Sequence, residues 1–205
     1  VRGITLRAWH AVKPRPWHEV LPVYLQAGRG LAAAHAAGVV HRDFKPDNVM
    51  IGDDGRVRVM DFGLARALEW ADSEHRDDLL RTHEGMASTL TADGTLLGTP
   101  AYMAPEQYGR GVVDAHSDQF AFCVALFEAV YGQRPFAGEN LRSLAASVKR
   151  GEIREPPRRG VPRWLRRIVT RGLAVDPAKR WPSLAVLLAH IERGQALARL
   201  RWVGV

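Results

Sequence analysis

The strongest constraint on this chain is a dense set of polar residues in one short stretch, followed by a second acidic motif. Residues 41–48 read His41-Arg42-Asp43-Phe44-Lys45-Pro46-Asp47-Asn48, and residues 61–63 read Asp61-Phe62-Gly63. Asp43 and Asp61 supply two carboxylates, Lys45 an ammonium group and Asn48 a carboxamide at fixed offsets. Phosphoryl transfer needs such a set: a base near the attacking hydroxyl, a cation for the moving phosphate and hard oxygen ligands for magnesium.

Local patterns predict the elements on both sides of this stretch. Apolar and small residues recur at helical spacing over residues 17–37. Two strand-like stretches, 49–51 and 57–60, flank a Gly-Asp-Asp-Gly turn. Such a hairpin would hold Asn48 and Asp61 close together at its outer ends, as two ligands of one metal ion require.

The second half of the chain is predicted to be mainly helical. Residues 117–131 are apolar nearly all round, which is typical of a helix that is buried on every side. Amphipathic helices are expected at 141–150, 162–174 and 183–200. Residues 64–103, by contrast, show little periodicity, and a connection of this length inside a compact domain is often functional.

Composition argues against several classes of protein. The net charge of +7 comes from 25 Arg and 4 Lys, but the arginines are scattered without interleaved aromatic residues, so we expect no nucleic-acid partner. The single cysteine, Cys123, cannot form an internal disulfide and lies in an apolar run, which predicts a buried thiol in a reducing compartment. The longest apolar stretch, 120–131, is too short to span a membrane and contains Glu128.

The motifs resemble those of the protein kinase family. Residues 41–48 resemble the family's catalytic loop, because five of its residue types stand at the same offsets. Asp61-Phe62-Gly63 resembles the metal-binding motif, and Ala104-Pro105-Glu106 completes the order. The resemblance implies a mainly α fold with a small β-hairpin, the large helical lobe of the kinase fold, which is α+β overall. The smaller lobe's glycine-rich loop, strand lysine and helix glutamate do not precede His41. We therefore interpret residues 1–192 as the C-terminal lobe of a kinase domain, with residues 1–6 as the hinge to an N-terminal lobe.

The resemblance implies a role for each motif residue. Asp43 would be the catalytic base, and Lys45 would contact the transferred phosphate of ATP. Asn48 and Asp61 would bind Mg²⁺ and, through it, ATP. Thr99 would join the catalytic set by hydrogen bonding to Asp43 and Lys45. The residues with structural roles would be His41, Phe62, Gly63, Glu106, Asp118 and Arg180.

The same resemblance implies long-range contacts and a mode of regulation. Glu106 would pair with Arg180, and Asp118 would accept hydrogen bonds from the backbone of the catalytic loop. Arg42 would pair with a phosphate on the family's activation segment, here residues 61–106, and so order it. Thr91 and Thr95 are the first candidates for that phosphorylation.

The expected function is transfer of the ATP γ-phosphate to Ser/Thr hydroxyls of proteins by a bacterial-type serine/threonine protein kinase in signal transduction. Lys45 at its offset is typical of serine/threonine kinases. Without its own N-terminal lobe as partner, the chain would be inactive or nearly so. Two alternatives stay open: a pseudokinase that binds or scaffolds partners, and a small-molecule kinase, against which Ala104-Pro105-Glu106 and the Thr99 segment argue.

The end of the chain suggests a location. Basic residues between 193 and 201 precede Trp202-Val203-Gly204-Val205, a pattern typical of a cytoplasmic segment that enters a membrane helix. We therefore treat residues 193–205 as a basic juxtamembrane-like tail and expect a membrane anchor beyond Val205. The lobe itself would lie in the cytoplasm, at the inner membrane in the parent protein. The alternative is a helix end at an arbitrary cut.

Overall fold

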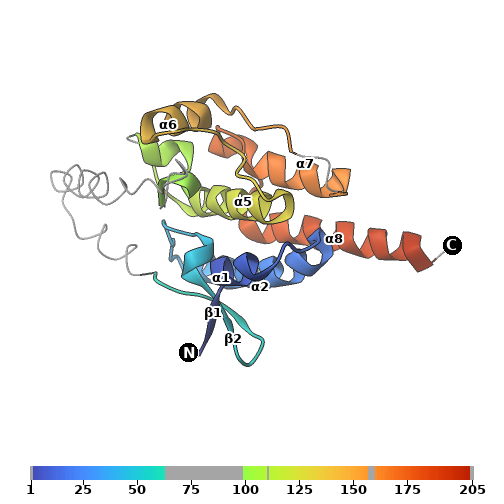
Figure 1. The fold of residues 1–205 in the computed structure, drawn as a ribbon. Coiled ribbons are helices and arrows are strands. Elements are labelled where there is room, and N and C mark those ends of the chain that lie inside the picture. The colour runs from blue at the N-terminus through green and yellow to red at the C-terminus, as the bar shows by residue number, and fades with distance from the viewer. Residues whose placement is uncertain (1, 63–98, 110, 157–159, 204–205) are drawn as a thin grey trace.

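A computed structural model describes residues 2–62, 99–109, 111–156 and 160–203 of the chain (Figure 1). The described part is mainly helical with one small sheet, which confirms the predicted fold class. The four helices that the sequence predicts in this part after the hairpin are present at close to the predicted positions, and so is the helix before the catalytic loop. The bounds are α2 Trp17–Ala36, α5 Ala115–Tyr131, α6 Leu141–Arg150, α7 Arg163–Gly172 and α8 Leu184–Val203.

The sheet contains the predicted hairpin and one additional strand. Strands β2 (Val49–Gly52) and β3 (Val57–Val59) pair antiparallel, and β1 (Gly3–Thr5) pairs antiparallel with the other edge of β2. The stretch interpreted as a hinge therefore contains a strand, whose three residues are too few to show a period of two.

Helix α1 (Leu6–Val12) follows β1 directly and was not predicted from the sequence. Thr5 begins it, because its Oγ1 accepts a hydrogen bond from the backbone N–H of Ala8 at 3.2 Å. The helix ends before Pro14, whose ring disfavours helical backbone in the residue that precedes it. Seven residues form fewer than two full turns, so the apolar period is too short to be recognised.

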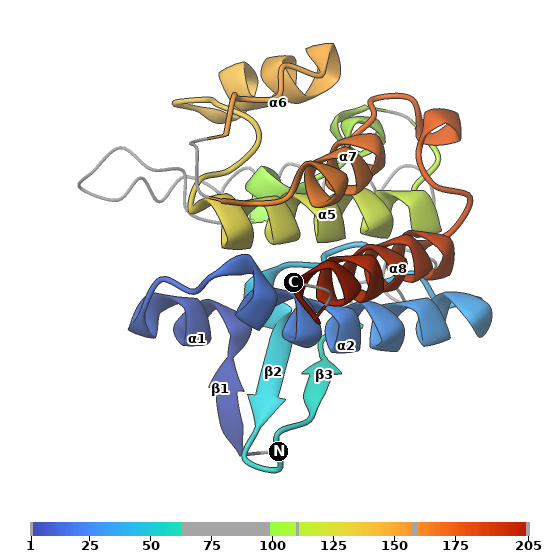
Figure 2. The same cartoon turned by 90° about the vertical axis from the view of Figure 1, so that its right-hand side faces the viewer.

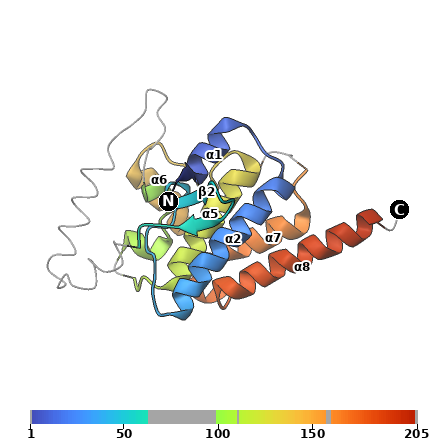
Figure 3. The same cartoon turned by 90° about the horizontal axis from the view of Figure 1, so that it is seen from below.

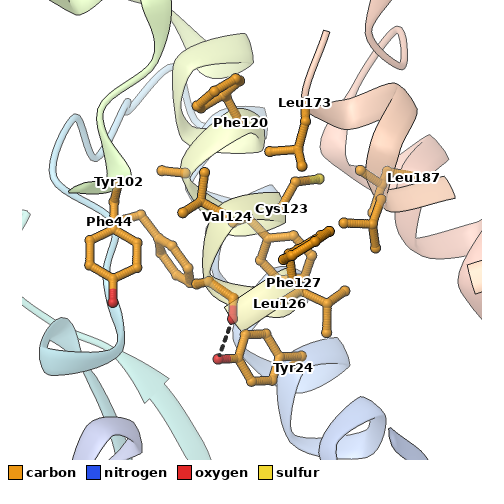
Figure 4. Close-up of a cluster of buried hydrophobic side chains, with 14 of the residues drawn as sticks. Tyr24, Phe44, Tyr102, Phe120, Cys123, Val124, Leu126, Phe127, Leu173 and Leu187 are labelled. Atoms are coloured by element: carbon orange, nitrogen blue, oxygen red, sulfur yellow. Dashed lines mark hydrogen bonds between the residues drawn. The ribbon is translucent and has the colours of Figure 1, made fainter. Parts of the chain in front are cut away.

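Helix α5 forms the centre of the lobe. It lies between α6 and α7 on one side and α2 with the sheet on the other, while α8 runs beside α2 and α7 (Figures 1 and 2). Its central residues are buried all round, as the apolar run predicts. Figure 4 shows this core, where the Tyr24 hydroxyl on α2 donates a hydrogen bond to the Ala125 carbonyl on α5 at 3.1 Å. The labelled core side chains are Tyr24, Phe44, Tyr102, Phe120, Cys123, Val124, Leu126, Phe127, Leu173 and Leu187.

One close approach between α5 and α7 depends on a glycine. A Cβ on Gly172 would lie 2.3 Å from the Cys123 Sγ, so only a residue without a side chain fits there. Cys123 is fully buried and free, as predicted, and burial raises the pKa of its thiol above the ordinary value. The thiol therefore contributes to packing and stays protonated.

Helix α8 continues to Val203, so the predicted boundary at residue 193 falls inside a helix. The end of α8 projects beyond the other helices (Figure 3). Within the described ranges, no helix is both long enough and apolar enough to cross a bilayer.

Candidate active site

A single buried carboxylate fixes the backbone of the catalytic loop. Asp118 lies in the first turn of α5, and its Oδ2 and Oδ1 accept hydrogen bonds from the backbone N–H groups of His41 and Arg42, both at 2.7 Å. The Nε2 of His35, at the end of α2, lies 2.8 Å from Asp118 Oδ2. The two backbone contacts are those expected from the family resemblance. His35 was missed, because on the sequence it is one more position on a helix face.

The loop needs this support because Arg42 adopts a left-handed backbone with φ of 68°. For a side chain with a Cβ this conformation costs about 1–2 kcal/mol. Hydrogen bonds at both backbone groups offset the cost: the N–H donates to Asp118, and the carbonyl accepts from Gln107 Nε2 at 2.9 Å. The turn at Arg42 sets the direction in which the next residue, Asp43, leaves the loop.

The side chains of Lys45 and Asn48 both hydrogen-bond to the Asp43 carboxylate. Lys45 Nζ donates to Asp43 Oδ2 at 2.7 Å, and Asn48 Nδ2 donates to the same oxygen at 3.1 Å. Asn48 Nδ2 also donates to the Asp43 backbone carbonyl at 2.9 Å. The Asp43 and Lys45 side chains are only 10% and 19% exposed. Their hydrogen bonds are therefore largely shielded from water, and the side chains are held in place.

The hairpin brings Asp61 beside this group, as its strand pattern predicts. Val49 of β2 pairs with Val59 of β3, and the Met60 N–H donates to the Asn48 carbonyl at 2.8 Å. Asp61 therefore follows a residue bonded directly to the catalytic loop. Its φ of 61° is left-handed, a conformation that Asp tolerates better than most residues, and the residue is exposed.

These residues fit a magnesium ion that is bound partly by phosphate oxygens. Asn48 uses its Nδ2 for both hydrogen bonds to Asp43, which leaves the Oδ1 as the atom that can act as a ligand. Asp61 offers an exposed carboxylate. No group of three or more His, Cys, Asp or Glu side chains converges within residues 2–62, 99–109, 111–156 and 160–203. Mg²⁺ needs only one or two protein oxygens where substrate phosphates and water complete its shell.

His41 links the two motifs from the inside. It is fully buried, and its Nε2 lies 2.8 Å from the Met60 carbonyl. Its ring packs against Phe62 with centroids 4.7 Å apart. Gly63 lies outside the described residues, as do Thr91 and Thr95, so their predicted roles stay predictions.

The segment from Thr99 to Tyr108, which we call the docking segment, packs over the catalytic loop. It contains two 3₁₀ turns, η2 (Thr99–Tyr102) and η3 (Pro105–Tyr108). Gln107 holds it from both sides, because its Oε1 accepts from the Ala104 N–H at 2.8 Å while its Nε2 donates to Arg42. The Thr99 side chain is outside the described part, so its contact with Asp43 stays a prediction. A small pocket between loop and segment is lined by residues that include Asp43, Phe44, Tyr102, Met103 and Gln107.

The far end of the docking segment is fixed by the expected contact between Glu106 and Arg180. The Arg180 Nη1 and Nη2 donate to Glu106 Oε1 and Oε2, each at 2.8 Å, and the Ser117 hydroxyl donates to Oε1 at 2.7 Å. Burial alone would raise the pKa of Glu106, but the Arg180 and Ser117 hydrogen bonds outweigh it and lower the pKa below its ordinary value.

A second polar cluster, around Tyr102, was not predicted from the sequence. The Tyr102 hydroxyl accepts from Arg7 Nη2 at 2.8 Å and donates to Glu128 Oε2. Arg134 Nε donates to Glu128 Oε1 at 3.2 Å. Burial, reinforced by the Glu128 charge, raises the pKa of Tyr102 above its ordinary value, so the hydroxyl stays protonated and able to donate.

Comparison with known proteins gives a consistent result. The protein kinase domain family model matches residues 16–191. Serine/threonine-protein kinase PknL of Mycobacterium tuberculosis is 36% identical over 198 residues, which cover 94% of this chain and 45% of that protein. Serine/threonine-protein kinase PknB of Mycobacterium leprae is 33% identical over 196 residues, which cover 94% of this chain and 29% of that protein. The chain thus spans less than half the length of these curated relatives.

Two solved structures share the fold. The crystal structure of Rad53 1–466 in complex with AMP-PNP has a TM-score of 0.67 at 25% identity and covers 93% of this chain and 44% of that chain. The crystal structure of the Rad53 kinase domain and SCD2 in complex with AMPPNP has a TM-score of 0.69 at 24% identity and covers 93% of this chain and 65% of that chain. At 24% identity, the second match shows similarity of fold alone.

Proposed function

The chain belongs to the protein kinase family and resembles bacterial serine/threonine kinases, and on that premise we propose that the protein transfers the ATP γ-phosphate to serine and threonine hydroxyls of proteins. One observation carries the proposal. The Asp43 carboxylate receives hydrogen bonds from Lys45 and Asn48, on a loop whose backbone is fixed by Asp118. This arrangement provides a preorganised base with a cation beside it, which is what the reaction requires.

Each group has a distinct task in this proposal. Asp43 accepts or orients the proton of the attacking hydroxyl. The Lys45 ammonium offsets charge on the transferred phosphate. Thr99 would hold both side chains in register from the docking segment.

ATP and Mg²⁺ are the cofactors of the proposal. Asn48 and Asp61 would hold the ion, and the bound ion would neutralise phosphate charge. The crystal structure of Rad53 1–466 is a complex with AMP-PNP, which supports an adenine nucleotide as the ligand of this fold. An N-terminal lobe would cover the nucleotide from the other side, so we expect the chain to be nearly inactive without that lobe.

Regulation and location are part of the same proposal. Arg42 would pair with a phosphate on Thr91 or Thr95 and order the activation segment. The protein would act on protein substrates in the cytoplasm, at the inner face of the inner membrane if the parent protein carries an anchor beyond Val205.

The test is phosphate transfer by the intact parent protein from labelled ATP to a peptide library, followed by phosphoamino-acid analysis. We expect label on serine and threonine that depends on Mg²⁺, and Asp61→Asn should weaken the metal-dependent binding of ATP. Label on tyrosine alone, or on a small molecule but no peptide, would overturn the assignment. If the protein is instead a non-catalytic scaffold, neither the wild type nor Asp61→Asn should transfer phosphate above background.

A further inference from the structure

Arg7 joins three parts of the lobe that are far apart in the sequence. It lies on α1, and its Nε donates to Asp47 Oδ1 at 2.7 Å while its Nη2 donates to the Tyr102 hydroxyl at 2.8 Å. Asp47 lies in η1 (Pro46–Asn48), the turn of the catalytic loop that leads into Asn48. One guanidinium therefore holds the catalytic loop and the docking segment at the same time.

The contact continues into the central helix. Tyr102 can accept from Arg7 because its own proton is donated to Glu128 of α5, and Glu128 is held in turn by Arg134. Each polar group in this series of hydrogen bonds thus has a partner that lies on another element. The result is a continuous path from α1 through η2 to α5.

Hydrogen bonds link the docking segment to the catalytic loop on both its η3 side and its η2 side. One is the hydrogen bond from Gln107 to the Arg42 carbonyl, on the η3 side. The other is Arg7, on the η2 side. The Glu106–Arg180 pair fixes the segment at its far end, and these two contacts add a fixed orientation relative to the catalytic loop.

Overall stability is a poor explanation for Arg7. The Arg7 and Asp47 side chains are 43% and 42% exposed, and exposed ion pairs of this kind contribute little to folding. What the arginine provides is geometry, because its planar fork can hold two acceptors at a fixed angle and a lysine ammonium cannot.

We propose that Arg7 is a positioning residue that fixes the docking segment against the catalytic loop, so that the acceptor hydroxyl of a protein substrate reaches Asp43. This inference rests on the proposed kinase activity. The hydrogen bonds of Arg7 go to Asp47 and Tyr102 rather than to Asp43, Asn48 or Asp61, so it acts through those two residues.

The test compares Arg7→Met and Arg7→Lys with a matched control in the intact protein. The control is Arg29→Met, since Arg29 forms an exposed pair with Glu192 at 2.7 Å on the α2–α8 face, away from the site. Kinetics should show kcat/KM for a peptide substrate about tenfold lower in both Arg7 variants, with KM for ATP and the thermal midpoint unchanged. Arg29→Met should match the wild type in every respect.

A second measurement does not require activity. Hydrogen exchange of the backbone amides of Asn48, Met103 and Gln107 should be about fivefold faster in Arg7→Met, the factor that corresponds to losing about 1 kcal/mol of local stability. The same amides should exchange at the wild-type rate in Arg29→Met. If the wild-type protein transfers no phosphate, the proposed function fails, while the exchange comparison still decides whether Arg7 holds the segment.

The proposal is overturned by either of two results. The first is exchange in Arg7→Met that is indistinguishable from Arg29→Met. The second is an Arg7→Lys variant with wild-type kinetics and exchange, because charge without the fork would then be sufficient.

Discussion

Glu106 and Arg180 form a buried, bidentate ion pair between the docking segment and the loop before α8. The two Nη–Oε distances are both 2.8 Å, and the side chains are 8% and 0% exposed. Arg180 also donates to the carbonyls of Ala174, Val175 and His116. One guanidinium thus connects its own loop to the docking segment, the start of α5 and the residues that follow α7.

Breaking this pair should destabilise the fold strongly. Arg180→Met leaves the Glu106 carboxylate buried without its charge partner, and we expect a loss of about 3–5 kcal/mol in the free energy of unfolding. Urea titration measures it. The matched control is Arg150→Met, whose pair with Glu152 has side chains 60% and 55% exposed and should contribute far less to stability. Equal losses in the two variants would contradict the structural role.

Stability should rise with pH between about 4 and 6.5 because of His10. Burial lowers the pKa of His10 from 6.5 to about 4, against the opposing charge of Glu128 and with smaller lowering effects from Arg15 and Arg7. Its ring lies beside the Tyr24 hydroxyl, with Nε2 3.4 Å away. In this window the unfolded chain binds a proton that the folded chain does not, so acid favours unfolding and the contribution is complete above pH 6.5.

The pH prediction is checked by unfolding titrations of the wild type and His10→Gln from pH 4 to 7.5. The advantage of the wild type over the variant should grow through the window and level off above it. His18→Gln, at an exposed position of α2, serves as the control and should show no such trend. A His10→Gln difference that is constant with pH would refute the assignment.

The contact between α5 and α7 should tolerate no side chain at Gly172. Gly172→Ala places a methyl group against the Cys123 Sγ, and we expect a cost of about 1–3 kcal/mol. Cys123→Ala removes that sulfur, so the double variant should recover at least half of the penalty in a double-mutant cycle. Gly30→Ala is the control: its Cβ would lie 3.6 Å from Val59 Cγ2, and the change should be neutral or stabilising. Additive effects of Gly172→Ala and Cys123→Ala would show that the two positions do not meet.

The sequence predicted what depends on local patterns. Helices α2 and α5 are long enough for their apolar periods to be read, and the Gly-Asp-Asp-Gly turn marks the hairpin that brings Asp61 to Asn48. The candidate site residues Asp43, Lys45 and Asn48 could be singled out because they lie within a few residues of one another.

The missed features are short or long-range. Strand β1 and helix α1 have three and seven residues, too few for a periodic signal. His35 meets Asp118 across 83 positions, and Arg7 meets Tyr102 across 95. Such contacts arise from the packing of α2 against α5 and of α1 against η2, and no local pattern in either partner specifies the other.

The role of Asp43 as the catalytic base is tested most directly by the rate at which the intact Asp43→Asn protein transfers phosphate to a serine or threonine peptide. Asparagine has nearly the same shape but cannot accept the proton, so turnover should fall by about 10²–10⁴-fold while the urea midpoint changes little. Asp53→Asn, an exposed residue in the hairpin turn, should retain wild-type turnover. Near-normal turnover by Asp43→Asn would contradict the assignment of Asp43 as the base.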